Sequence, residues 1–251
     1  MSVHYVELRP SEFRERLAAA PIAYLPLGTL EWHGEHLPLG SDGLQSQGFF
    51  EQLAREVGGI VMPMLFLGPD RRDVQPDGSE LYGMDLGTNL PGPRRYADQQ
   101  LDGSAYWLPD ETFQILLETV LKQVARAGFR IVVAHGHGPS TNFFLERIPQ
   151  WLEKFGLDCY ICWSEDRYDN GLGIQVDHAA ANETSLVMAL RPDLVDMDAL
   201  PSDLDRWPLA IGGRDPRTEA SPEVGRQAIA KQSQRMAGVL RNALARLDSA
   251  R

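Results

Sequence analysis

The chain has 251 residues, of which 43% are hydrophobic, and a formal net charge of −11 at pH 7. This length fits one large α/β domain or two small ones, and the apolar content can fill a core without a disulfide or a structural metal. The acidic balance argues against nucleic acid and against an anionic membrane as partners. We expect neither a membrane span nor a signal peptide, because no apolar stretch reaches roughly 18 residues and residues 1–10 lack an apolar core.

Apolar residues with helical spacing alternate along the chain with short apolar runs that are typical of buried strands. The runs predict strands at 22–27, 60–67, 130–134 and 157–163. Helices are predicted over 11–20, 43–57, 110–127 and 142–155, in a short segment ending at 190, and over 223–247. Asp110 is the expected N-cap of the third of these helices. The alternation predicts a parallel sheet with covering helices.

The two cysteines, Cys159 and Cys162, lie within the apolar run 157–163. A lone C-x-x-C is weak evidence for a redox or metal site, and in a strand this spacing points the two thiols to opposite faces. We therefore interpret them as buried structural thiols of a protein in the reducing cytoplasm.

Residues 68–109 interrupt the alternation of strands and helices. The segment is rich in Gly, Pro and Asp, and its aromatic and arginine residues have no period. Such a long loop is a lid over the functional site, a subunit contact or a partly ordered insertion, and functional loops dominate this class. We expect it to cover the mouth of the site, from its own or a neighbouring subunit. The residues that could stack on or clamp a substrate are Tyr82, Arg94, Arg95, Tyr106 and Trp107.

The loop that follows the first predicted strand carries Glu31, His33 and Asp42. Open α/β sheets place their chemistry on loops at the carboxyl ends of strands. Carboxylates and imidazoles are ligands that Zn²⁺, Mn²⁺ or Fe²⁺ accept. Taken singly, each of these residues is more often a solvated loop side chain, but a second strand-end loop carries His135 and His137. Together the two loops predict a metal site.

Three stretches together resemble the creatininase, or creatinine amidohydrolase, family. They are LPLGTLEWHGEHLPLGSD at 25–42, HGHGPSTN at 135–142 and DHAAANETS at 177–185. Residues 190–196 and the pair at 225–226 are also similar to the family, so the resemblance covers nearly the whole chain except about 68–109.

The resemblance implies one domain over residues 1–251, with a three-layer α/β/α sandwich around a mostly parallel sheet. It also implies a homo-oligomer, often a hexamer. The activity that it implies is hydrolysis of an amide-type C–N bond at one or two divalent metal ions (Zn, Mn or Fe). The substrate would be a small molecule, and we expect a small cyclic or formylated amide cleaved by a metal-activated water.

Site residues follow from the same resemblance, residue by residue. Glu31, His33, Asp42 and His137 match metal ligands of the family. Glu183 matches a motif glutamate that we take as a further ligand and catalytic group, and His178 matches the proton-transfer histidine. Asp177 lies beside His178, and we assign His36 and His135 supporting or pocket roles.

The chain departs from the family pattern at several positions. Trp32 replaces a Gln, His135 an Asn, and Pro139–Ser140 a Gly–Asn pair. In creatinine-cleaving members a ligand glutamate stands where this chain has Pro139. The substrate is therefore left open, and the alternative is a non-catalytic member of the fold that serves as a binding or assembly module.

Overall fold

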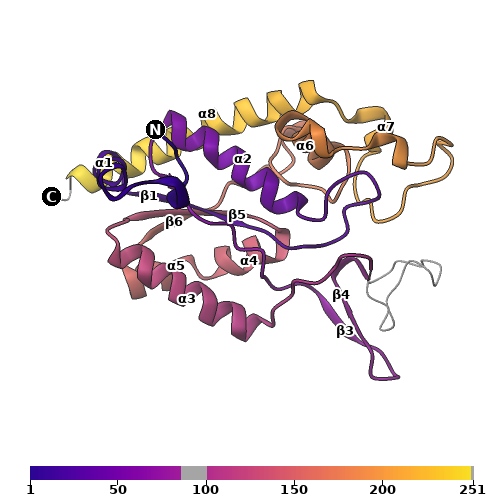
Figure 1. Ribbon diagram of the computed structural model, residues 1–251, viewed down its shortest axis with the longest axis horizontal. Coiled ribbons are helices and arrows are strands. Elements are labelled where there is room, and N and C mark those ends of the chain that lie inside the picture. Colours follow the sequence, from indigo (N-terminus) through magenta and orange to yellow (C-terminus); the bar gives the residue numbers. More distant parts are fainter. Residues whose placement is uncertain (86–100, 250–251) are drawn as a thin grey trace.

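The computed structural model describes residues 1–85 and 101–249. A central sheet of four parallel strands has the spatial order β2-β1-β5-β6. The strands are β1 (Ile22–Leu27), β2 (Ile60–Val61), β5 (Ile131–Gly136) and β6 (Asp158–Tyr160). Helices cover both faces of this sheet (Figure 1), which confirms the predicted three-layer α/β/α sandwich.

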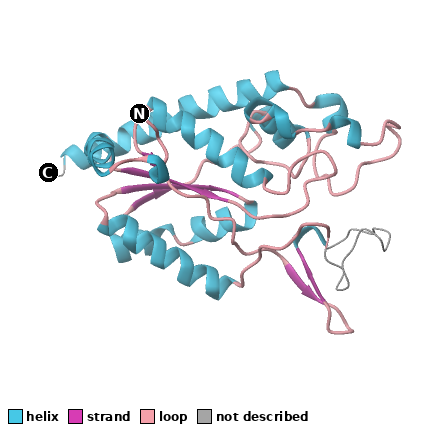
Figure 2. Cartoon of the chain, viewed as in Figure 1, coloured by secondary structure: helices cyan, strands magenta, loops and turns pink. Residues whose placement is uncertain are grey.

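The helices divide into two layers that bury the two faces of the sheet (Figure 2). One layer holds α2 (Ser41–Glu56), α6 (Ala181–Leu190) and α8 (Pro222–Ser249). The other holds α3 (Asp110–Arg126), α4 (Gly138–Glu146) and α5 (Ile148–Phe155). The remaining described helices are α1 (Pro10–Ala19), α7 (Pro216–Glu219) and the 3₁₀ turns Tyr5–Glu7, Gly83–Asp85, Asp169–Gly171, Pro192–Leu194 and Met197–Ala199.

Strand β1 shows why the apolar runs of this sequence are continuous. All of its six residues are buried. Ile22 and Tyr24 pack into the cluster beneath α2 and α8, whereas Ala23, Leu25 and Leu27 pack into the cluster of α3 and α5. A parallel strand covered on both faces needs apolar side chains at every position, not only at alternate ones.

Strands β1 and β5 pair along their whole length, from Ile22 opposite Ile131 to Leu27 opposite Gly136. They end side by side, so the loops that follow them leave from one point on the sheet edge. Gly136 has a φ of +150°, and a Cβ there would lie 1.6 Å from the carbonyl oxygen of Leu27. Only glycine permits this approach of the two strand ends.

Several predictions differ from the observed elements. The strand at 157–163 is shortened to β6. The strand at 60–67 is reduced to β2, because Pro63 has no N–H to donate, although Leu65 still bonds to the Pro26 carbonyl of β1. The helix at 142–155 is two helices that meet at Arg147, since Pro149 cannot continue the hydrogen bonds of α4. Asp110 is the first residue of α3 and Pro109 is its N-cap, so the predicted cap was wrong.

Part of the 68–109 segment has regular structure that the sequence did not predict. β3 (Arg72–Val74) and β4 (Glu80–Tyr82) form an antiparallel hairpin that extends away from the central sheet (Figure 1). Each strand has three residues, and β3 is exposed throughout, so no hydrophobic alternation marks it. Residues 86–100, which include Arg94 and Arg95, lie outside the described part of the chain.

Both cysteines are buried free thiols, as predicted. Cys159 packs with α3 and α5, and Cys162 packs with α2 and α8, on opposite sides of the sheet. Burial raises the pKa of Cys159 to about 12. Within the described ranges no helix has both the length and the apolar character needed to cross a membrane.

Two glycines of α8 provide a test of the packing between α6 and α8. A Cβ at Gly225 would lie 1.9 Å from the Ser185 carbonyl oxygen of α6, whereas a Cβ at the exposed Gly238 meets nothing within 4 Å. We expect Gly225→Ala to destabilise the fold by about 1–3 kcal/mol or more, because the helices must separate. Gly238→Ala should stabilise it by roughly 0.5–1 kcal/mol through helix propensity. Urea unfolding of both variants measures the difference, and equal effects would contradict this packing.

Candidate metal centre

Five predicted site residues lie together at the carboxyl edge of the sheet. Glu31 and His33 come from the loop after β1, and Asp42 is the second residue of α2. His137 immediately follows β5, and Glu183 is in the first turn of α6. All five are at least 93% buried. The common end of β1 and β5 therefore brings together residues that are far apart in the sequence.

Glu31, Asp42 and His137 form one cluster of possible metal ligands. His137 Nδ1 lies 3.1 Å from Glu31 Oε1 and 3.0 Å from Asp42 Oδ2. His33, Asp42 and Glu183 form a second cluster, in which His33 Nε2 lies 3.5 Å from Asp42 Oδ1 and 3.6 Å from Glu183 Oε2. Asp42 belongs to both clusters and presents a different oxygen to each.

The charges of these residues depend strongly on one another. Burial disfavours ionisation of Asp42, but the charge of His33 and a hydrogen bond from His137 outweigh it and hold the pKa of Asp42 well below its usual range. Burial lowers the pKa of His33, yet the carboxylates of Asp42, Glu183 and Glu31 raise it to about 10. Burial and the Asp42 charge raise the pKa of Glu183 well above its usual range. The carboxylates thus need positive charge from protons or from a cation.

The spacing around His33 fits a shared cation, whereas His137 Nδ1 is within hydrogen-bond distance of Asp42 and Glu31. His33 Nε2 stands 3.5–3.9 Å from oxygens of Asp42, Glu183 and Glu31, and it makes no hydrogen bond with the described residues. N–H···O bonds span about 2.7–3.2 Å, whereas two ligands at ~2.1 Å from a tetrahedral zinc stand roughly 3.4 Å apart. Imidazole and carboxylate donors also suit manganese and iron. These residues therefore fit divalent metal.

His178 lies at the edge of these two clusters and forms a third group of possible metal ligands with Glu31 and His33. Its ring lies against that of His33, tilted by 30° with 4.5 Å between centroids, and its Nδ1 is 3.9 Å from Glu31 Oε1. Its Nε2 lies 3.0 Å from the Trp32 carbonyl oxygen. The side chain retains 23% of its exposure, so a small molecule can reach it.

None of the three remaining candidates belongs to a group of possible metal ligands among the described residues. His36 Nε2 bonds to Thr184 Oγ1 at 2.8 Å and connects the first loop to α6. His135 is fully buried and lies edge-on to Trp163. Asp177 accepts the backbone N–H groups of Asn182 and Glu183, which stabilises the start of α6.

Two residues near the clusters had not been predicted. Gln175 Nε2 donates to the Asp42 carbonyl oxygen at 3.0 Å, and Asp70 Oδ2 lies 3.4 Å from His137 Nε2. Asp70 follows the β2 segment at the same edge of the sheet, and that position could have singled it out. Gln175 has a φ of +51° in an irregular loop, and no periodic signal marks it.

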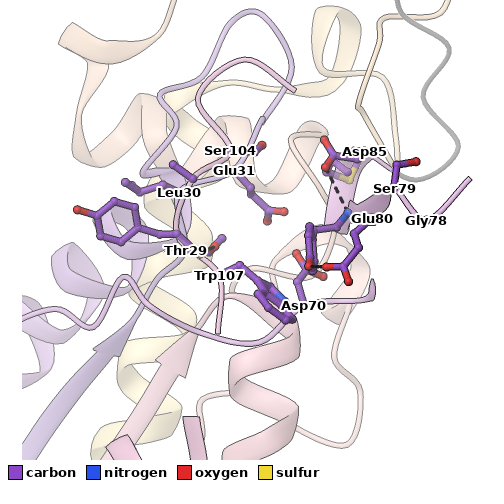
Figure 3. Close-up of a pocket in the computed structure, with 15 residues that line it drawn as sticks. Thr29, Leu30, Glu31, Asp70, Gly78, Ser79, Glu80, Asp85, Ser104 and Trp107 are labelled. Atoms are coloured by element: carbon purple, nitrogen blue, oxygen red, sulfur yellow. Dashed lines mark hydrogen bonds between the residues drawn. The ribbon is translucent and has the colours of Figure 1, made fainter. Parts of the chain in front are cut away.

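Two cavities meet at the centre. One, of about 380 Å³, lies over the clusters and is lined by Asp42, His137, His178 and Glu183. The other, of about 580 Å³, shares Glu31 and Asp70 with the first and extends under the β3–β4 hairpin. Figure 3 shows Glu31 on one side of this larger cavity, Glu80 and Asp85 on the other, and Trp107 below. Tyr82 and Tyr106 also line it, so described residues of 68–109 reach the site.

A parallel α/β sheet with buried carboxylates and imidazoles at its strand ends is typical of a metal-dependent hydrolase. The model of the creatininase family, described as creatinine amidohydrolase, matches residues 6–76 and 101–240. The chain therefore belongs to the creatininase family, whose members are metal-dependent amidohydrolases, and it is a hydrolase of C–N bonds other than ordinary peptide bonds.

Individual relatives agree with this assignment. The creatinine amidohydrolase of Pseudomonas putida is 30% identical over 216 residues, which cover 78% of this chain and 75% of that protein. A manganese creatininase structure superimposes with a TM-score of 0.72 at 24% identity, over 97% of this chain and 99% of that chain. A crystal structure of creatinine amidohydrolase gives 0.71 at 24% identity, over 95% and 96%. At these identities the solved structures establish the fold.

Metal binding should stabilise this protein measurably. Adding Mn²⁺ or Zn²⁺ at about 100 times Kd to EDTA-treated protein should stabilise the native state by ~2.7 kcal/mol, which raises the Tm by roughly 5–10 °C. Asp42→Asn should abolish the shift because both clusters use this carboxylate. Asp110→Asn, at an exposed site on α3, should retain it. Differential scanning calorimetry checks this, and an unchanged Tm in the parent protein would contradict a metal centre.

Proposed function

We propose that this chain hydrolyses the C–N bond of a small cyclic or formylated amide at a centre that holds two divalent ions. The observation that carries the proposal is the position of Asp42, with one oxygen in each cluster. A carboxylate shared in this way holds two ions about 3.5–4 Å apart in known two-metal sites. The proposed ligands are Glu31, Asp42 and His137 for one ion, and His33, Asp42 and Glu183 for the other.

Zinc, manganese or iron would suit these donors. Solved creatininase structures include a manganese form and a mutant described as Zn-Zn type. Bound divalent ions would polarise the amide carbonyl and lower the pKa of a water molecule to near 7.

We assign His178 the transfer of a proton to the leaving nitrogen. The Trp32 carbonyl can only accept a hydrogen bond, so Nε2 of His178 carries the hydrogen and Nδ1 keeps its lone pair. Nδ1 is the atom that faces Glu31 and the cavity over the clusters. Nδ1 would therefore take up the proton that the attacking water loses and release it to the departing amine.

Glu183 supplies a carboxylate that position 139 cannot supply. Pro139 stands where creatinine-cleaving relatives are expected to have a ligand glutamate, and its ring offers no donor atom. Glu183 Oε2 is 3.6 Å from His33 Nε2 and is held by the backbone N–H of Ala179 at 2.9 Å. We assign Glu183 both to the second ion and to proton transfer.

The 580 Å³ cavity would hold the part of the substrate that does not react. Its volume is within the range of small-molecule sites. The charged residues among the described lining are all acidic: Glu31, Asp70, Glu80 and Asp85. Arg72, outside the lining, pairs with Glu80. The carboxylates of Glu31 and Asp70, with Glu80 beside Arg72, favour a neutral or cationic substituent in this larger cavity. Arg71 and Arg167 line the smaller cavity over the clusters.

A panel of lactams, formamides and ureas with added Mn²⁺ or Zn²⁺ tests the reaction. We expect turnover that EDTA abolishes and metal restores. His178→Asn should lower kcat by about 10²–10⁴-fold with its metal content unchanged. His4→Asn, at a site that pairs with Glu51 away from the centre, is the matched control. Full activity of His178→Asn would contradict the role of this histidine.

Substrate charge gives a separate test. For amides of equal size, an anionic substituent should reduce kcat/KM by roughly tenfold, which corresponds to ~1.4 kcal/mol of repulsion. Glu80→Gln should narrow the gap between the neutral and anionic substrates, since it removes one carboxylate from the lining. A preference for the anionic amide would contradict the placement of the substrate in this cavity.

The family resemblance also leads us to propose a cytoplasmic homo-oligomer, which light scattering and cell fractionation would examine. The non-catalytic alternative has no observation in its favour among the described residues. A binding module would not require His178 to present a free Nδ1 toward the cavity.

A further inference from the structure

Asp70 approaches His137 from the side opposite the metal ligands. It follows Gly68 and Pro69, at the end of the extended stretch that continues from β2 along β1. Its Oδ2 is 3.4 Å from Nε2 of His137. The Asp70 side chain is only 15% exposed and lines both cavities. Figure 3 shows it beside Trp107 on the wall of the larger cavity, across from Glu31.

The two ring nitrogens of His137 face different groups. Nδ1 faces the first ligand cluster, where it makes a hydrogen bond to Asp42 at 3.0 Å and lies 3.1 Å from Glu31. Nε2 is buried and has no hydrogen bond within the described part of the chain, and Asp70 is the carboxylate nearest to it. If Nδ1 binds metal, the remaining ring proton must reside on Nε2, where it points at Asp70.

The position of Asp70 is itself fixed by its surroundings. Its Oδ1 accepts the backbone N–H of Arg71 at 2.7 Å. Gly83 donates its N–H to the Arg71 carbonyl at 2.8 Å, and a Cβ on Gly83 would lie 2.3 Å from Asp70 Oδ2. The turn after β4 therefore packs directly against this carboxylate, and the space that it occupies exists because residue 83 has no side chain.

We infer that Asp70 is a positioning residue that accepts the Nε2–H of His137 and so aims Nδ1 at the first ligand cluster. The inference rests on the metal centre of the proposed function. Histidine ligands commonly donate their other ring N–H to a carboxylate, and loss of that partner typically weakens metal affinity by about 10–100-fold.

Zinc affinity of the full-length protein, measured by competition with a chelator, tests the inference without any substrate. Asp70→Asn should raise the Kd for Zn²⁺ by about tenfold, since it keeps an acceptor but loses the charge, and Asp70→Ala by up to ~100-fold. Asp73→Asn is the matched control, because Asp73 is exposed on β3 of the neighbouring hairpin and lines neither cavity. It should bind zinc as the parent protein does.

A ¹⁵N-histidine NMR spectrum of the zinc-loaded protein provides a readout that a purely structural role would not change. We expect His137 as the Nε2–H tautomer, with the exchange of this proton accelerated in Asp70→Asn. A Nδ1–H tautomer would overturn the inference, as would unchanged zinc affinity in Asp70→Ala. A rise in KM alone would also overturn it, because Asp70 would then be a substrate contact.

Failure of the proposed function is separable from failure of this inference. Suppose that the parent protein binds zinc, that the Asp70 variants bind it more weakly, and that no amide is hydrolysed. This result would refute the proposed reaction and leave the role of Asp70 intact. A parent protein that takes up no zinc would overturn both.

Discussion

The pairing of β1 with β5 is the constraint on which the rest of the centre depends. Because the two strands stay in register to their last residues, the Glu31 loop and His137 start from adjacent points. The His137 N–H bonds to the Leu27 carbonyl at 3.1 Å, which fixes the start of the second loop against the end of the first strand. A shift of one residue in this register would move His137 about 3.3 Å along the sheet. That displacement would separate it from both Glu31 and Asp42.

Electrostatics then restricts what this arrangement can do. Three carboxylates and two imidazoles lie almost fully buried within a few ångströms of one another. Buried carboxylates are stable only when opposite charge is close, and their mutual repulsion is large in a poorly solvated site. These buried charged residues do not stabilise the core well, because an apolar cluster of the same size would make the fold at least as stable. Its retention at a cavity is therefore better explained by binding of cations than by folding.

Local signals in the sequence predicted the layered fold and the ligand types. The apolar runs located β1 and β5, and the polar residues after them marked the site because strand ends of a parallel sheet share one edge. Local patterns alone could not reveal which of the nearby polar side chains face the centre, and the family resemblance supplied that choice. His36 and His135 lie in the same two strand-end loops as the proposed ligands. Contacts with Thr184 and with Trp163 turn their side chains away from the ligand clusters.

Asp70 and the β3–β4 hairpin were not predicted, for a different reason. Their positions depend on backbone bonds between segments, such as that from Gly83 to Arg71, that leave no periodic pattern in the sequence. The hairpin also packs against loops, where hydrophobic alternation is not required.

The proposed ligands and the larger cavity are thus held in place by different parts of the structure. The proposed ligands are held by the sheet edge and by the first turns of α2 and α6, so their geometry follows from the core of the domain. The larger cavity is closed by residues 78–85 and 104–107, and the family match is interrupted at 77–100, within this region. Asp70 connects the two parts, because it touches His137 on one side and Gly83 on the other. Changes in the hairpin can therefore alter which amide enters without moving the ligands, provided that the contact of Asp70 with His137 is kept.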